Sequence, residues 1–351
     1  MKIIFICYTD LKDQSRGSSV RPYKMYTAFK DRGYDILLIY GDFENRRKKY
    51  LELKNSGQLS GISYCYIEPS TYPVHPMDYL MFLHIKSLKI PTGIFYRDMY
   101  HKFPGLYKKK GIRKAILLLR YAVDWQIYKR VSRAIFFPSD TMASYFDFHT
   151  KVALPPACEK RFYEKIRITR NVIYVGGISE RYGTKVLLDA MKIVNERFGQ
   201  TVLFLVCREE NKEILDGYMN FEWLKVIKAS GEELEALYRE SDIAIIPILK
   251  IEYHELAFPV KLFEYFSFGL PVLATDCKET ANFILKHGAG KICRDDSESM
   301  AQAIIELYCD PDKLISISEN SKRTVLNGNL WDHRIERIEE YLLKKGANGK
   351  N

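Results

Sequence analysis

The sequence predicts an α/β protein built from two doubly wound parallel sheets that follow one another along the chain. Short, continuously apolar strands alternate with helical segments, which is typical of parallel sheets covered by helices on both faces. The pattern stops near residue 158 and restarts at NVIYVGG (171–177). With 351 residues, the chain is also longer than most single cores.

The first half opens as one βαβ unit with a long first loop. KIIFICY (2–8) reads as a strand, TDLKDQSRGSSV (9–20) as a loop, and residues 21–34 as a helix that leads into the strand DILLIYGD (35–42). Further strands are expected at 61–68, 92–98, 132–139 and 151–156. Pro155 and Pro156 then introduce a charged stretch, 158–170, that reads as a linker.

The second half repeats the alternation. Strands are expected at 171–175, 200–207, 223–229, 242–248 and 271–276. Helices are expected at 184–197, near 209–218, and at 231–241, 259–268, 278–288 and 297–308. The closing segment LWDHRIERIEEYLLKK (330–345) has the apolar spacing of a last amphipathic helix.

Charge is distributed unevenly between the halves. Residues 1–170 carry 31 Lys and Arg against 15 Asp and Glu, a net charge of +16, whereas the remaining 23 and 29 give −6. The basic half favours an anionic surface or ligand. Seven scattered cysteines without a CxxC pair favour reduced thiols in the cytosol, and no apolar run is long enough to span a membrane.

The stretch FPVKLFEYFSFGLPVLATD (258–276) places Lys261 and Glu264 in an otherwise apolar run. Lys261 falls in the first turn of the predicted helix, where the helix dipole disfavours a cation unless an anion shares the site. Glu264 lies on the same face and can accept hydrogen bonds from a pair of hydroxyls. A diphosphate next to a ribose fits both residues. The alternative is a solvated i, i+3 ion pair.

Three other groups of residues follow predicted strands. Gly176 and Gly177 allow a close backbone approach, although their spacing is not GxGxxG, and Arg181 adds a cation. In the first half, the loop residues Gly17, Ser18 and Ser19 offer donors before a helix, and Arg97, Asp98 and His101 follow another strand. Ordinary caps, turns and ion pairs explain these residues equally well.

The segment 101–133 holds ten Lys and Arg and one acid, Asp124, among apolar and aromatic residues. Such a basic amphipathic segment can lie on an anionic membrane surface. Alternatively, its apolar side belongs to the core and its basic side is only solvated. Nucleic acid is disfavoured because no binding motif accompanies the charge. DPD at 310–312 imitates a metal-binding motif but reads as a helix cap.

These motifs together resemble the retaining glycosyltransferases of family 4. VGGISERYGTKVLLDA (175–190) and FPVKLFEYFSFGLPVLATD are similar to the family's two signature segments. The resemblance implies the GT-B fold, with two Rossmann-like domains facing a central cleft. It places an acceptor-binding domain at 1–165 and a nucleotide-sugar-binding domain at 166–330. LWDHR resembles the start of the family's final helix, so 331–346 is expected to pack back on the first domain.

By the same resemblance, Glu264 holds the donor ribose, Lys261 and Arg181 hold the diphosphate, and the Gly176–Gly177 loop contacts its oxygens. Asp98 orients the acceptor, with Arg97 preceding it as in some polysaccharide enzymes. Many members place a sugar-binding glutamate where this chain has Leu256, and here Glu255 stands one residue out of register.

The resemblance implies retaining transfer of a sugar from a UDP- or GDP-linked donor to a lipid-linked or polysaccharide acceptor. We expect no metal or other cofactor and a cytoplasmic protein peripheral to the inner face of the plasma membrane. Alternatives are a soluble acceptor, a nucleotide-sugar epimerase or phosphorylase on the same fold, and a non-catalytic subunit that binds glycans or another glycosyltransferase.

Overall fold

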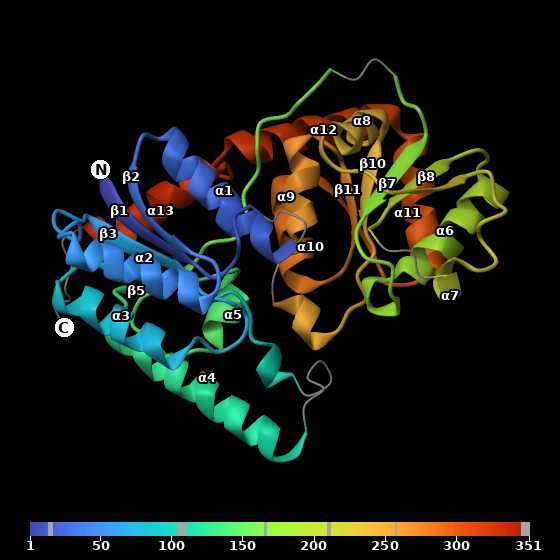
Figure 1. The fold of residues 1–351 in the computed structure, drawn as a ribbon. Helices are drawn as coiled ribbons and strands as arrows, with labels where there is room; N and C mark the ends of the chain where they lie inside the picture. The colour runs from blue at the N-terminus through green and yellow to red at the C-terminus, as the bar shows by residue number, and fades with distance from the viewer. Residues whose placement is uncertain (13–16, 104–109, 165–166, 209–211, 257, 345–351) are drawn as a thin grey trace, which may run out of the picture. The chain divides into compact units, whose positions relative to one another are not determined.

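The computed structural model describes residues 1–12, 17–103, 110–164, 167–208, 212–256 and 258–344 (Figure 1). The chain divides into two compact units. Unit 1 comprises residues 1–155 and the chain from Trp331 onward, and unit 2 comprises Pro156–Leu330. Each unit contains one six-stranded, fully parallel sheet, so the predicted α/β class with two doubly wound sheets is confirmed.

Unit 1 has the strand order β2-β1-β3-β4-β5-β6. Its strands β3, β4 and β5 are entirely buried, as expected when helices cover both faces of a parallel sheet. The strand bounds are β1 Lys2–Cys7, β2 Asp35–Tyr40, β3 Tyr64–Glu68, β4 Thr92–Phe95, β5 Ala134–Phe137 and β6 Lys151–Ala153.

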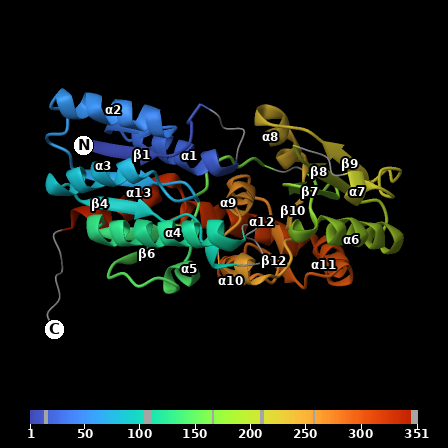
Figure 2. The same cartoon turned by 60° about the horizontal axis from the view of Figure 1, so that its bottom comes forward.

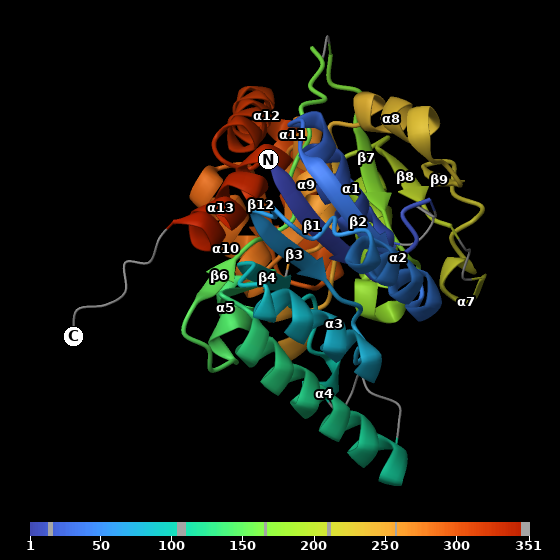
Figure 3. The ribbon, with the colours of Figure 1, turned by 60° about the vertical axis from the view of Figure 1, so that its left-hand side comes forward.

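The helices of unit 1 lie on both sides of this sheet. They are α1 Gly17–Asp31, α2 Phe43–Asn55, α3 Pro76–Ser87, α4 Gly111–Val131, α5 Asp140–Ser144 and α13 Trp331–Leu343, with a 3₁₀ turn, η1, at Tyr100–Lys102. Figure 3 shows α3 and α4 on one side of the sheet and α1 and α13 on the other.

Helix α1 begins earlier than the sequence predicts, and helix α13 packs against it. Helix α1 begins at Gly17 rather than near residue 21 and includes Pro22, because Ser19 and Arg21 are already buried in its first turns. Helix α13 packs on α1 and β4. The contact with β4 is close: a Cβ on Gly93 would lie 2.7 Å from the Phe136 ring and 3.1 Å from Leu342.

Unit 2 has the strand order β12-β11-β10-β7-β8-β9. Alternate residues of each strand enter separate cores, since strand side chains point to opposite faces. Val172 and Tyr174 join one cluster, and Ile173 and Val175 join the other. The strand bounds are β7 Asn171–Val175, β8 Val202–Val206, β9 Leu224–Ile227, β10 Ile243–Ile246, β11 Val272–Thr275 and β12 Gly290–Cys293.

The helices of unit 2 are divided between these two cores. Helices α6 and α11 lie side by side on one face (Figure 2), and α9, α10 and α12 contribute to the other. The bounds are α6 Thr184–Arg197, α7 Lys212–Leu215, α8 Gly231–Glu240, α9 Val260–Ser267, α10 Lys278–His287, α11 Ser297–Cys309 and α12 Pro311–Leu326, with 3₁₀ turns η3 Glu180–Tyr182 and η4 Glu252–Glu255. Within the described residues, no helix is both long and apolar enough to cross a bilayer.

The segment expected to be a linker is attached to unit 2 over its described part. The amide of Arg161 donates to the Ser267 carbonyl at 3.0 Å, and the Tyr163 hydroxyl donates to the Tyr238 carbonyl at 2.9 Å. The amide of Thr169 donates to the carboxylate of Asp242. These contacts explain why unit 2 begins at Pro156, before the charged stretch.

Candidate functional site

The strand order of unit 2 creates a topological switch point between β7 and β10. These strands are neighbours in the sheet, but the chain continues from them toward opposite edges. Loops at the carboxyl ends of such strands diverge and leave room for a ligand. Gly176, Gly177 and Arg181 follow β7, whereas Glu255, Lys261 and Glu264 follow β10. The topology therefore brings both groups of predicted donor-binding residues to one edge of one sheet.

The glycine loop after β7 is held by its own strand and by the neighbouring strand β8. The Gly176 amide donates to the Val206 carbonyl at 3.0 Å, and the Tyr174 hydroxyl donates to the Gly177 carbonyl at 2.8 Å. A Cβ at Gly176 would lie 2.5 Å from the Tyr174 hydroxyl oxygen, so this position has no room for a side chain. Gly177 is exposed, and its backbone is accessible to a ligand.

Arg181 is exposed and lies in η3, beside the loop that follows β10. Its guanidinium donates to the Tyr182 hydroxyl at 2.8 Å, and its carbonyl accepts from the Leu249 amide at 3.3 Å. Gly183 ends this turn with φ +67°, and a Cβ there would lie 1.7 Å from the Pro247 carbonyl oxygen. The two loops are therefore fixed against each other through backbone contacts.

Lys261 and Glu264 lie on the first turns of α9. The Lys261 ammonium donates to Glu264 Oε2 at 2.7 Å, and the Tyr238 hydroxyl donates to Glu264 Oε1 at 2.8 Å. Both side chains remain about one third exposed. The buried Tyr265 accepts from the Val175 amide at 2.9 Å, which joins α9 to the end of β7. The carboxylate is thus oriented by two donors and still accessible to a ligand.

Lys261 and Glu264 are in direct contact. Among the described residues, Arg181 forms no hydrogen bond or ion pair with either of them. Its ring partner is Tyr182, whose centroid lies 4.7 Å from the guanidinium carbon. Arg181 reaches the loop after β10 electrostatically, because its charge helps to lower the pKa of His254 after the larger effect of burial. The structure therefore places Lys261 and Glu264 as one pair and Arg181 on the adjacent loop.

Glu255, which stands one residue before the position of the family's sugar-binding glutamate, has one carboxylate oxygen paired and one unpaired in the described part of the chain. One carboxylate oxygen accepts from the amide of Lys278 at 3.0 Å, at the N-terminus of α10. The other oxygen, Oε1, is buried and has no hydrogen-bond partner among the described residues. Leu256, which stands where many family members have glutamate, is buried in the core. A buried acceptor without a partner is costly unless a ligand or water supplies a donor.

Sequence reasoning missed two residues at this edge. The Nδ1–H of His254 donates to the Leu249 carbonyl at 2.7 Å, and burial lowers the pKa of the ring, which keeps it neutral near pH 7. Tyr238 orients Glu264, and burial together with the Glu264 charge raises the pKa of its hydroxyl. His254 lies in the loop that follows β10. A histidine at the carboxyl end of a parallel strand is the signal that could have indicated this position.

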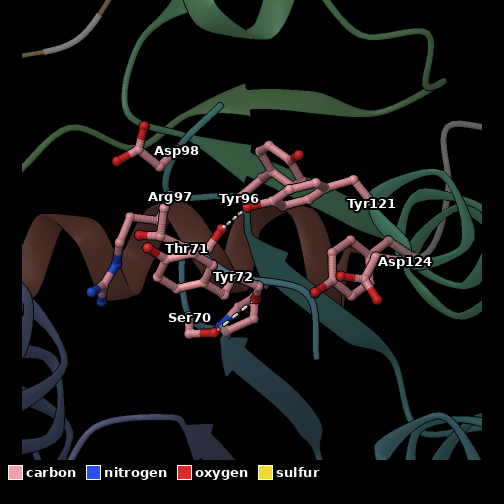
Figure 4. Close-up of a pocket in the computed structure, with 10 residues that line it drawn as sticks. Ser70, Thr71, Tyr72, Tyr96, Arg97, Asp98, Tyr121 and Asp124 are labelled. Carbon is pink, nitrogen blue, oxygen red and sulfur yellow. Dashed lines mark hydrogen bonds between the residues drawn. The ribbon is translucent and has the colours of Figure 1, made fainter. Parts of the chain in front are cut away.

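Unit 1 contains a pocket at the carboxyl ends of the neighbouring strands β3 and β4. The pocket is shallow and opens to solvent. Figure 4 shows Arg97 and Asp98 at one end of the pocket and Asp124 at the other. Its lining comes from the segments after β3 and β4 and from α4: Pro69, Ser70, Thr71, Tyr72, Tyr96, Arg97, Asp98, Tyr121, Asp124 and Tyr128.

Arg97 is held by a buried carboxylate that the sequence analysis did not single out. Glu68, the last residue of β3, accepts from Tyr66 at 2.9 Å and from Arg21 at 3.2 Å, and its other oxygen lies 3.5 Å from the Arg97 guanidinium. The Arg21 guanidinium also stacks on Phe95 at 3.7 Å. Asp98, in contrast, is only partly buried and accepts from the Met99 amide at 2.9 Å.

The two titratable groups beside Tyr121 are both neutralised to some degree by burial. His101 stacks on Tyr121, with ring centroids 3.9 Å apart, and burial followed by the Lys102 charge lowers the pKa of His101 to about 4. Burial raises the pKa of Asp124 to about 6, although the Tyr79 hydroxyl and the Val74 amide donate to it. His101 therefore contributes no positive charge to the pocket near pH 7.

The remaining predicted positions are placed as follows. Gly17 is the first residue of α1, the Ser18 side chain lies outside the described part of the structure, and Ser19 is buried in the first turn of the helix. Asp310 caps α12 by accepting from the Lys313 amide at 3.0 Å, which confirms the interpretation of DPD as a cap. The described residues contain no group of His, Cys, Asp and Glu that could hold a metal ion.

Comparison with known proteins agrees with this geometry. Residues 169–310 match the family model described as "Glycosyl transferases group 1". The matched segment covers most of unit 2, including both loops of the switch point and α9. No curated protein matches the sequence significantly.

Solved structures resemble the whole chain at low sequence identity. Sucrose-phosphate synthase from Thermosynechococcus elongatus has a TM-score of 0.69 and 15% identity, and the match covers 97% of this chain and 98% of that one. Alr3699/HepE from Anabaena, in complex with UDP, has a TM-score of 0.69 and 12% identity over 97% and 99%. WaaG, a glycosyltransferase involved in lipopolysaccharide biosynthesis, has a TM-score of 0.64 and 14% identity over 98% and 100%.

At this level of identity, the structural matches show the fold, which is the two-domain α/β GT-B fold. The family match makes residues 169–310 similar to the group 1 glycosyltransferases.

Proposed function

We propose that the protein is a retaining glycosyltransferase that moves a sugar from a nucleoside-diphosphate sugar to a lipid-linked or polysaccharide acceptor. The observation that carries the proposal is the convergence, at the β7/β10 switch point, of a glycine loop, two cations and an oriented carboxylate. A nucleoside diphosphate needs these groups: backbone donors and cations for its phosphates, and an acceptor for its ribose hydroxyls.

In this proposal, Glu264 accepts from the ribose while Lys261 and Arg181 face the diphosphate. Lys261 donates one of its three N–H groups to Glu264, so the others are available to phosphate oxygens. Negative charge grows on the departing diphosphate as the sugar bond breaks, and cations held at that point stabilise the transition state. The unpartnered oxygen of Glu255 is assigned to a hydroxyl of the donor sugar. We propose that no metal or other cofactor is required.

The donor proposal is tested by calorimetry with UDP-glucose, UDP-galactose, UDP-N-acetylglucosamine and GDP-mannose. We expect one of them to bind and to release its nucleoside diphosphate when an acceptor is added. Nuclear magnetic resonance of the product then shows whether the anomeric configuration is retained. Binding without release of the nucleoside diphosphate would favour a non-catalytic subunit, and a product that still carries the nucleotide would favour an epimerase.

We place the acceptor in the unit 1 pocket, next to Asp98. Asp98 is the partly exposed carboxylate of this pocket, whereas Asp124 is buried and already accepts two hydrogen bonds. A carboxylate beside the pocket can accept a hydrogen bond from the attacking hydroxyl and orient it for attack. UDP in the Anabaena structure and the lipopolysaccharide role of WaaG support this choice of donor and acceptor classes.

Asp98→Asn is therefore expected to slow transfer without weakening donor binding. Octyl glycosides can serve as acceptors, since their sugar and alkyl chain imitate a lipid-linked glycan. We expect kcat/KM for the acceptor to fall by about 10- to 100-fold, because a neutral amide is a weaker acceptor than a carboxylate. Asp147→Asn, at an exposed carboxylate of the same unit, is the control. Equal transfer rates for both variants would remove Asp98 from the reaction.

A further inference from the structure

Helix α4 presents an apolar stripe to solvent. Ile112, Ile116, Leu119 and Val123 follow the spacing i, i+4, i+7, i+11, which places them on one face of a helix. Their exposed fractions are 77%, 53%, 65% and 40%. Singly exposed apolar residues are ordinary, but a continuous stripe of this kind marks an interaction surface. At 21 residues and ~1.5 Å per residue, the helix is roughly 30 Å long.

The opposite face of α4 fixes the helix to unit 1. Leu117, Tyr121 and Tyr128 are buried there, and the Tyr121 hydroxyl donates to the Thr71 carbonyl at 2.9 Å. The single acid of the helix, Asp124, also points inward and accepts from Val74 and Tyr79. The outward face therefore combines apolar side chains with basic ones and carries no acid, and the helix does not need to move to expose it.

The charges on this helix select among possible partners. Arg113 and Arg130 are exposed on α4, and Lys110 precedes it, whereas the Arg120 guanidinium donates to the Val74 carbonyl at 3.1 Å. A second copy of the chain would oppose these cations with the same cations across a two-fold axis, which is unfavourable. An anionic bilayer matches both kinds of side chain on this face, because its phosphates can bind the arginines and its acyl chains can cover the apolar stripe.

We propose that α4 lies in the surface of an anionic bilayer, with Ile112, Ile116, Leu119 and Val123 inserted below the headgroups. This inference rests on the proposed function and specifies its membrane partner. Tyr121 and Asp124 line the unit 1 pocket from the inner face of the same helix (Figure 4). The pocket and the inserted stripe are therefore separated by about one helix diameter, roughly 10 Å. That position suits an acceptor whose sugar projects from a membrane-embedded lipid.

The test is flotation of the full-length protein with vesicles of phosphatidylcholine alone or mixed with phosphatidylglycerol. We expect binding to the mixed vesicles and at least about tenfold weaker partitioning of the double variant Ile112→Ser/Leu119→Ser, which loses inserted apolar area. The matched control is Ile315→Ser/Leu285→Ser, two similarly exposed positions in unit 2, with exposed fractions of 57% and 61%. This control is expected to float like the wild type. Arg113→Gln is expected to weaken binding at low salt and to have little effect at high salt.

Equal flotation of both double variants, or no binding of the wild type to either vesicle, would overturn the proposal. A stripe variant that changes the protein from dimer to monomer in solution would overturn it as well, because it would assign the stripe to a second copy. Donor binding is measured on the same samples without vesicles. If the protein binds the donor but does not float, only the proposed membrane-binding surface is rejected. If it floats but does not bind the donor, only the proposed donor site is rejected.

Discussion

Glu264→Ala is expected to weaken nucleotide-sugar binding by about 10- to 100-fold and to reduce transfer at least as much. The carboxylate is held by Lys261 at 2.7 Å and Tyr238 at 2.8 Å, so it is preorganised for the ribose hydroxyls. Hydrogen bonds to a charged acceptor contribute about 1.5–3 kcal/mol, which corresponds to this loss of affinity. Calorimetric titration of the donor identified in the panel measures the effect.

The chain offers a matched control for this variant. Glu319 and Lys322 form another i, i+3 pair, 2.6 Å apart, on α12. An exposed pair of this kind contributes at most about 1 kcal/mol to stability, so Glu319→Ala tests whether losing a helical ion pair matters by itself. We expect it to bind the donor like the wild type. If Glu264→Ala also binds like the wild type, Glu264 is a surface ion pair and the proposed donor site is wrong.

Gly183→Ala is expected to have the largest effect on stability. The residue has φ +67°, and the added Cβ would lie 1.7 Å from the Pro247 carbonyl oxygen. The left-handed conformation costs a residue with a side chain about 1–2 kcal/mol, and the overlap with rigid backbone adds about 1–3 kcal/mol. A loss of roughly 2–5 kcal/mol in the free energy of unfolding should appear as a lower urea midpoint by circular dichroism.

Gly199→Ala separates the two contributions. Gly199 follows the other end of α6 with φ +101°, and a Cβ there meets nothing within 4 Å. We therefore expect the backbone cost alone, about 1–2 kcal/mol. If both variants lower the urea midpoint equally, the close approach between the Arg181 turn and the loop after β10 is absent in solution.

The second half of the fold was predictable because its local signals agree with its tertiary structure. Helix α6 was expected at 184–197 and is found at Thr184–Arg197, since apolar spacing, a preceding glycine and a buried face coincide there. The strands of unit 2 were likewise expected from continuous apolar runs. Strand β12 and helix α12 were not expected, because GKIC is short and only half-buried and α12 has few apolar residues.

Helices α2 and α3 were missed for a different reason. The sequence of α2, FENRRKKYLELKN, is dominated by charge, and one of its buried residues is Arg46. That guanidinium is buried through an ion pair with Asp78 at 2.7 Å and stacking on Tyr8 at 3.7 Å. Neither partner is near Arg46 in sequence, so the hydrophobic pattern gives no indication of which face is buried.

The same limit applies to the candidate site. Lys261 and Glu264 are three residues apart, and their contact follows from helical spacing. The contact of Glu68 with Arg21 and Arg97, and that of Glu264 with Tyr238, depend on strand order and side-chain direction. The sequence could therefore indicate the residues that we propose to face a ligand, but it could not indicate the buried groups that orient them.

The return of the last helix to unit 1 has a consequence for synthesis of the protein. Ile335, Ile338 and Leu342 of α13 are fully buried in unit 1, and Leu342 closes over Gly93. This helix emerges from the ribosome only after all of unit 2, Pro156–Leu330, which takes roughly ten to thirty seconds at about 5–20 residues per second. During that time the nascent N-terminal domain exposes the apolar surface that α13 later covers. The domain made first is thus completed last.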